Sequence, residues 1–206
     1  MNKPSITDTR MSTLQKSNQG FNEVSLDSYL AEERILSLTG SITQQTAIWF
    51  SKEMVDLLLK DSEKPVKILL DSVGGSIDAG NMILDVITGS PVPVSIYCLN
   101  QAYSMAAVIF SVATGGRYML PNAKVMIHQP SIVDISGNAT EVSQMSAFLQ
   151  EDKIKLFTIL AEHSDFTLEE LEQKASNDLY LTANEAVSRK LADGIVTFAE
   201  IIQQHS

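Results

Sequence analysis

A serine, Ser104, stands inside an otherwise largely apolar stretch, CLNQAYSMAAVIF, at residues 98–110. It follows a strand-like run and opens a run of small and apolar residues that predicts a helix. Unpaired backbone N–H groups and the helix dipole favour negative charge at a helix start, where the N–H groups of Ser104 and Met105 would lie. Serine is also a common N-cap residue, so this position alone leaves open a nucleophile or a simple cap.

Two adjacent glycines, Gly74 and Gly75, follow another buried strand-like run in the motif DSVGGSIDAG. Paired glycines let a backbone approach a ligand closely and can direct N–H groups at a developing oxyanion. They also suit an ordinary turn between a strand and a helix.

A histidine and an aspartate complete this set of polar residues. His128 ends the apolar run KVMIHQP, and Asp178 stands just before the short apolar run in SNDLYLTANEAV. Imidazole is the commonest general base near neutral pH, and a carboxylate can hold a histidine N–H and fix its tautomer. A buried, hydrogen-bonded histidine and a turn aspartate are the plain alternatives.

Together the four features supply a nucleophile, a base, a residue that orients the base, and oxyanion donors. Each stands at the end of a regular element, near the carboxyl ends of strands. Their order along the chain is Ser, His, Asp, and the chain has no Gly-x-Ser-x-Gly motif, which disfavours an α/β-hydrolase. Chemistry of this kind needs no metal and no organic cofactor.

Alternating strand and helix patterns predict the frame that positions these residues. Gly40 is expected to end the first strand, and Ser25 and Thr43 are expected to cap helices. The expected strands lie at 34–40, 66–71, 92–100 and, joined by the turn PNA, within 117–130; the expected helices lie at 25–34, 43–60, 81–89, 104–116, 167–175 and 182–191. This order predicts an α/β fold with right-handed crossovers around a largely parallel sheet.

A long helical pattern covers residues 138–163 and would span on the order of 40 Å. That length exceeds what one core of this size can cover. Part of its apolar stripe is therefore expected to meet another subunit. The stripe consists of Val142, Met145, Leu149, Leu156, Ile159 and Leu160.

Composition sets the broad class of the protein. The 206 residues fit one domain, expected at residues 21–206 after a polar, mobile N-terminal tail at residues 1–20. The net charge of −10 disfavours nucleic acid as a partner. No apolar run is long enough for a membrane span or a secretory signal, so the default compartment is cytoplasmic, with an organellar transit peptide as the alternative. The single cysteine, Cys98, has no disulfide partner within the chain and is expected to be buried filler.

Taken together, the motifs VGGSIDAG, QAYSMAA, LPNAKVMIHQP and YLTANEAVSRKLADGIV resemble the proteolytic subunit of the ATP-dependent Clp protease. The resemblance runs from about residue 33 to residue 197. It implies a serine endopeptidase in which Ser104 is the nucleophile, His128 the general base and Asp178 the residue that orients it. The N–H groups of Gly75 and Met105 would form the oxyanion hole.

The resemblance also implies a crotonase-like α/β fold of repeated β-α-β units with a protruding long helix. Its members form heptameric rings that pair into a tetradecamer. Unfolded polypeptides, delivered by a Clp-type AAA+ ATPase, would be degraded inside this chamber as part of protein quality control.

Some positions depart from the family pattern. Val73 replaces a usual proline, Asn100–Ser104 replaces Gly-Gln-Ala-Ala-Ser, and Ala106 replaces a glycine, so substrate preference is more affected than chemistry. Asn177 replaces an arginine that takes part in a ring contact, and the first 30 residues lack the family's axial-loop sequence. Three alternatives remain: a specialised paralogue with little activity outside mixed rings, a non-catalytic structural subunit, and a crotonase-type acyl-CoA enzyme.

Overall fold

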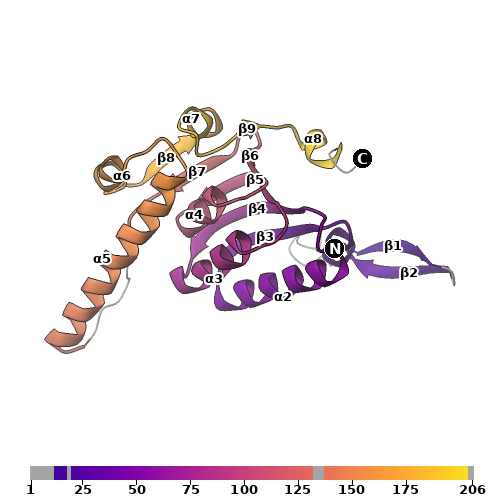
Figure 1. Ribbon diagram of the computed structural model, residues 1–206, viewed down its shortest axis with the longest axis horizontal. Coiled ribbons are helices and arrows are strands. Elements are labelled where there is room, and N and C mark those ends of the chain that lie inside the picture. Colours follow the sequence, from indigo (N-terminus) through magenta and orange to yellow (C-terminus); the bar gives the residue numbers. More distant parts are fainter. Residues whose placement is uncertain (1–11, 18–19, 132–136, 204–206) are drawn as a thin grey trace, which may run out of the picture.

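The protein folds around one mostly parallel β-sheet, seen in Figure 1. The computed structural model describes residues 12–17, 20–131 and 137–203. Within them the sheet has the order β3-β4-β5-β6-β9, while β7 pairs with both β5 and β8. Its strands are β3 (Ile35–Ile42), β4 (Val66–Gly75), β5 (Val94–Tyr103), β6 (Gly116–Met119), β7 (Lys124–Ile127), β8 (Leu179–Thr182) and β9 (Gly194–Ile195).

Eight helices accompany the sheet in the described part of the chain. They are α1 (Leu26–Glu32), α2 (Gln44–Lys60), α3 (Ile77–Thr88), α4 (Met105–Ser111), α5 (Ala139–Glu162), α6 (Leu168–Lys174), α7 (Ala183–Ser188) and α8 (Phe198–Gln203). All strand pairs of the sheet are parallel except β7 with β8. The prediction of an α/β fold with a largely parallel sheet is confirmed.

The core lies between the sheet and helices α2, α3 and α4 (Figure 1). Helix α2 buries one face of four side chains, including Phe50 and Met54, as its 3.6-residue repeat predicts. Every residue of α4 is buried, which explains why its sequence is apolar on all sides except at Ser111, whose hydroxyl donates to the Val108 carbonyl. Ser104 thus stands at the start of a helix held on all sides by packing.

The predicted helix caps are also present. The hydroxyls of Ser25 and Thr43 accept hydrogen bonds from backbone N–H groups in the first turns of α1 and α2. Thr167 and Thr182 form capping boxes with the acidic residue three positions later.

Several boundaries differ from the prediction. Strands β4 and β5 continue to Gly75 and Tyr103, beyond the predicted ends at residues 71 and 100, so the glycine pair lies inside β4 and not after it. Gly40 does not end its strand, because β3 continues to Ile42 after a register shift between Gly40 and Ser41. The extra residue of this bulge is Val73 of β4, which lies between the pairs Gly40–Ser72 and Ser41–Gly74, and Gly40 opposite it has a positive φ of +75°. Helix α3 begins at Ile77 with Ser76 as its cap, four residues before the predicted start at 81, and α4 ends well before residue 116.

The N-terminal segment also holds regular structure. Residues 12–17 fall inside the predicted tail, yet they form β1 (Ser12–Ser17), which pairs antiparallel with β2 (Gly20–Ser25). The sequence does not predict this hairpin, because its side chains are mostly polar and alternate only weakly. Its two strands pair with each other and form a sheet separate from the main one. Residues 1–11 and 18–19 of the predicted tail lie outside the described residues, and its last residue, Gly20, begins β2.

Helix α5 extends away from the sheet (Figure 1). At 24 residues it is about 36 Å long. Its buried residues, Leu156, Phe157 and Leu160, all lie near its C-terminal end, whereas Val142 and Phe148 are exposed by 38% and 64%. The prediction that this chain's own core cannot cover the whole apolar stripe is confirmed.

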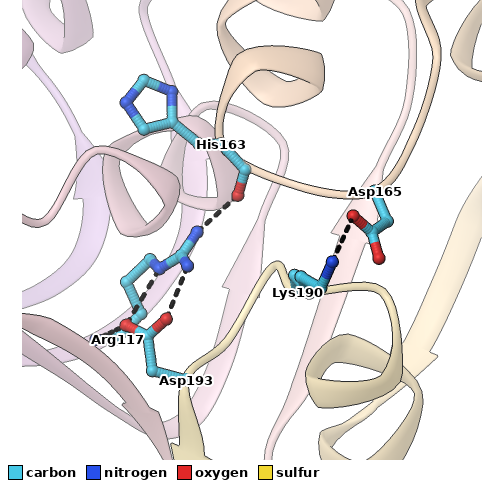
Figure 2. Close-up of polar contacts among 5 residues, drawn as sticks. All are labelled: Arg117, His163, Asp165, Lys190 and Asp193. Carbon is cyan, nitrogen blue, oxygen red and sulfur yellow. Dashed lines mark hydrogen bonds and ion pairs between the residues drawn. The ribbon is translucent and has the colours of Figure 1, made fainter.

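A charged cluster fixes the C-terminal end of α5 to the edge of the sheet (Figure 2). The Arg117 guanidinium in β6 donates to both carboxylate oxygens of Asp193, just before β9, and to the backbone carbonyl of His163, which caps α5. Lys190 pairs with Asp165 at 3.0 Å beside it. The Arg117 side chain is mostly shielded from solvent, and its planar guanidinium links β6, the residue before β9 and the end of α5 by hydrogen bonds.

Two further findings bear on the predicted class. None of the helices in the described residues is long and apolar enough to cross a membrane. Cys98 is buried, as predicted, and burial raises the pKa of its thiol to about 12, which leaves it unreactive.

Candidate active site

Three neighbouring strands bring the candidate residues to one place. Ser104 directly follows β5, His128 directly follows β7, and Asp178 directly precedes β8. Strand β7 pairs with the end of β5 in parallel and with β8 in antiparallel, with its last residue, Ile127, opposite Leu179. The end of β5, the end of β7 and the start of β8 therefore coincide at one edge of the sheet.

The hydroxyl of Ser104 lies 2.7 Å from Nε2 of His128. Ser104 makes no side-chain cap hydrogen bond to α4, so its hydroxyl faces the imidazole instead of the helix. Its backbone has φ at +56° and ψ at −125°, a conformation that costs a non-glycine residue about 1–3 kcal/mol. Two hydrogen bonds hold it there: the Ser104 N–H donates to the Met126 carbonyl at 2.8 Å, and the Ala107 N–H donates to the Ser104 carbonyl at 2.9 Å.

At the end of β4, Gly74 packs directly on this turn and Gly75 packs on the end of β3. A Cβ atom on Gly74 would lie 2.5 Å from the Tyr103 carbonyl oxygen and 2.8 Å from Cβ of Ser104. A Cβ atom on Gly75 would lie 2.2 Å from the carbonyl oxygen of Ile42. Both residues have positive φ, at +86° and +152°, so the sequence needs glycine here for space and for conformation.

Ser72 holds the glycine turn in place through two hydrogen bonds of its side chain. Its side chain is fully buried and donates to the Gly40 carbonyl at 2.6 Å, while it accepts the Gly74 N–H at 3.1 Å. Sequence reasoning missed this residue, although it lies inside the motif DSVGGSIDAG. Its polar side chain within an apolar strand was the available signal.

Asp178 is more loosely held than Ser104 and His128. Its Oδ1 atom lies 3.9 Å from Nδ1 of His128, beyond hydrogen-bond length, and its side chain is 52% exposed. The Tyr180 hydroxyl donates to Oδ2 of Asp178 at 3.4 Å. Desolvation and the Asp178 carboxylate raise the pKa of Tyr180, so this hydroxyl remains protonated at neutral pH.

Two hollows flank the serine and the histidine. An open cleft runs past Val73, Gly75 and Met126 to Ser104 and His128. A narrower apolar pocket opens beside it between α3, α4 and the C-terminal part of α5. Its apolar lining consists of Ile77, Met105, Val108, Ile127, Pro130, Leu156, Phe157 and Leu160. The Ser104 hydroxyl thus stands between a cleft that suits an extended backbone and a pocket that suits an apolar side chain.

The arrangement supports acyl transfer to a serine better than any metal-dependent reaction. A hydroxyl bonded to an imidazole, a carboxylate behind that imidazole and a helix start beside the hydroxyl are the parts that such chemistry uses. Among the described residues, no group of three or more His, Cys, Asp or Glu side chains could hold a metal ion.

A comparison with known protein families decides the relationship. The family model for Clp protease matches residues 18–199. The chain belongs to the Clp protease family. This membership confirms the resemblance seen in the motifs, and it makes the chain a ClpP-type peptidase with the mixed α/β fold described above.

The predicted Clp protease site residues can now be located. Ser104 and His128 are in hydrogen-bond contact, and Asp178 lies behind the imidazole at the longer distance given above. Gly75 lines the cleft, and Met105 begins α4 and lines the apolar pocket. The roles of these five residues in catalysis stay predictions.

Proposed function

We propose that this chain is a serine endopeptidase subunit that cuts unfolded polypeptides by means of Ser104, His128 and Asp178. The observation that carries the proposal is the 2.7 Å contact between the Ser104 hydroxyl and Nε2 of His128, made by a serine whose backbone is held out of the ordinary helical conformation. Membership of the Clp protease family supports it independently.

The reaction begins when Oγ of Ser104 attacks a peptide carbonyl carbon while Nε2 of His128 takes the hydroxyl proton. The carbonyl oxygen becomes an oxyanion, stabilised by the N–H groups of Gly75 and Met105. The C–N bond then breaks, the imidazolium protonates the leaving amine, and an ester remains on Ser104. Water, activated by His128, hydrolyses this ester and restores the serine hydroxyl.

Each supporting residue has a defined task in this sequence. Asp178 orients the His128 ring and stabilises the imidazolium that forms in each half of the reaction. The packing of Gly74 against Tyr103 and Ser104 keeps the oxyanion donors beside the nucleophile. The apolar pocket next to Ser104 favours substrates with an apolar side chain before the cleaved bond.

The working form is an assembly of this chain in heptameric rings that pair into a tetradecamer. The exposed apolar residues of α5, including Val142, Met145 and Phe148, support a contact with another subunit along that helix. Clp protease family members generally form rings with Clp ATPases, which makes a Clp-type AAA+ ATPase the proposed supplier of unfolded substrate.

A second candidate function is that of a weakly active or regulatory subunit in mixed rings with a paralogue. The observation that favours it is the 3.9 Å separation between Asp178 and His128, together with the 52% exposure of the Asp178 side chain. An imidazole without a firmly bound carboxylate loses much of its catalytic effect.

Peptide hydrolysis by the purified chain, alone and mixed with an active paralogue, tests both candidates. Ser104→Ala should abolish cleavage of a short fluorogenic peptide while the thermal unfolding midpoint stays close to that of the wild type. Ser188→Ala, a matched change on the exposed surface of α7, should leave the rate unchanged. Activity that survives Ser104→Ala contradicts the nucleophile assignment, and activity seen only in mixed rings favours the second candidate.

A further inference from the structure

Two tyrosines link the strand that ends at the nucleophile to the strand that begins at the carboxylate. Tyr103 precedes Ser104 at the end of β5, and Tyr180 lies two residues after Asp178 in β8. Their rings meet edge to face, with centroids 5.7 Å apart and planes at 88°. This is a favourable geometry for two aromatic rings.

The sheet register explains how rings from two strands that are not paired with each other can meet. Tyr103 pairs with Met126 across the β5–β7 ladder, and Met126 pairs with Tyr180 across the β7–β8 ladder. The three residues form one row across the sheet, so their side chains point to the same face. The two rings therefore meet over Met126, next to the segment that carries His128.

Within the described part of the chain, Tyr180 donates the hydrogen bond that the Asp178 carboxylate accepts. Its hydroxyl reaches Oδ2 at 3.4 Å, on the carboxylate oxygen away from His128, while Oδ1 faces Nδ1 of the histidine. A half-exposed aspartate whose contact with the histidine is 3.9 Å long can turn to solvent at little cost. A hydrogen bond on the outer oxygen opposes that rotation.

We propose that Tyr180 is a positioning residue for Asp178, and that the ring of Tyr103 holds Tyr180 in the orientation this task requires. The hydroxyl restricts the carboxylate to the side chain conformation that faces His128. The edge-to-face contact restricts Tyr180, a residue that is 52% exposed even with this contact in place. This inference rests on the proposed function, because it concerns the residue that orients the general base.

The test replaces the hydroxyl and the ring separately. Tyr180→Phe keeps the ring contact with Tyr103 and removes the hydrogen bond to Asp178. We expect kcat for a short peptide to fall about fivefold with KM unchanged, which corresponds to about 1 kcal/mol of transition-state stabilisation. Tyr118→Phe is the matched control, since it makes the same change in the stacked pair of Tyr97 and Tyr118 in β5 and β6, and it should keep the wild-type kcat.

The pH profile separates positioning from a merely structural role. The acidic limb of kcat/KM reports protonation of the general base. In the Tyr180→Phe variant this limb should move to lower pH, because a carboxylate turned to solvent stabilises the imidazolium less. Within the described part of the chain, the carboxylate that forms an ion-pair contact with His128 is that of Asp178, at 3.9 Å from Nδ1.

A double-mutant cycle tests the part played by Tyr103. Tyr103→Ala should also lower kcat, and adding it to Tyr180→Phe should cause little further loss, because both changes act through one hydroxyl. Fully additive losses contradict the link between the two tyrosines.

Two outcomes distinguish this inference from the proposed function. In the first, Tyr180→Phe folds and Ser104 still reacts with a fluorophosphonate, but kcat and the acidic limb match the wild type, or the variant changes KM alone. The positioning role is then wrong and the peptidase assignment stands. If the wild-type protein neither cuts peptides nor reacts at Ser104, both are wrong.

Discussion

Replacing Gly74 by alanine tests the link between the glycine turn and the nucleophile. The new Cβ would lie 2.5 Å from the Tyr103 carbonyl oxygen, 2.8 Å from Cβ of Ser104 and 2.9 Å from the Met105 nitrogen. Two of these atoms belong to the backbone and the third is the first side-chain carbon of Ser104. None can swing aside as the tip of a long side chain could, so the turn itself must move.

The magnitude follows from those distances. Relief of the overlap to ordinary contact at about 3.4 Å requires a shift of about 0.5–1 Å, and a misplacement of 1 Å near a reacting group can cost about 100-fold in rate. The positive φ of +86° adds about 1–2 kcal/mol of strain for any side chain. For a chain of this length, each kcal/mol lowers the unfolding midpoint by about 2–4 °C.

Gly20→Ala is the matched control for that strain. Gly20 also has positive φ, at +125°, but a Cβ there would meet no described atom within 4 Å. Peptide hydrolysis and thermal unfolding should show a loss of stability in both variants and a loss of kcat/KM of about 100-fold in Gly74→Ala alone. Wild-type activity in a folded Gly74→Ala protein would refute the argument that this contact sets the position of the nucleophile.

Three further changes test other parts of the account. Ser72→Ala should lower the free energy of unfolding by about 1–3 kcal/mol in urea titrations and reduce kcat, because the buried Gly74 N–H loses its acceptor; unchanged stability would contradict this role. The hydrogen bond from Arg189 lowers the pKa of Glu170 to about 2. The ionised carboxylate of Glu170 therefore stabilises the fold fully above about pH 4.5, and this stabilisation is lost as the pH falls towards 2. Glu170→Gln can keep the capping box but carries no charge, so its urea midpoint should fall less steeply across that pH window than the midpoint of the wild type. Parallel curves for the two proteins would argue against a stabilising pair of Glu170 and Arg189. Phe148→Ser, a change at a side chain exposed by 64% on α5, should lower the native mass of the assembly without unfolding the chain, whereas an unchanged mass would remove α5 from the subunit contact.

Much of the fold was predictable because its signals are local. Strand VKILLD and helices such as α2 are marked by runs and repeats of apolar residues, and the helix caps are marked by Ser25 and Thr43. The error at Gly40 has a local cause as well: glycine ends many strands, but here it lies within a strand, beside a bulge in β4. Nothing in sequence periodicity distinguishes these two uses.

The candidate site was predictable only in part. The motifs around Ser104 and His128 indicated their partnership, whereas the contact of Tyr180 with Asp178 depends on side-chain conformation and on the register of β7 with β8. Ser72 was missed for a related reason, since its role requires the carbonyl of Gly40 from a neighbouring strand. Partners that come from distant parts of the chain leave no spacing in the sequence.

The most direct measurement of the central claim is the site of covalent modification by a fluorophosphonate. Peptide mass spectrometry of the wild-type protein should find the adduct on Ser104. His128→Ala should slow the reaction by orders of magnitude, since the hydroxyl then loses the base 2.7 Å away. An adduct on another residue, or equal labelling of wild type and His128→Ala at Ser104, would contradict a serine activated by this histidine.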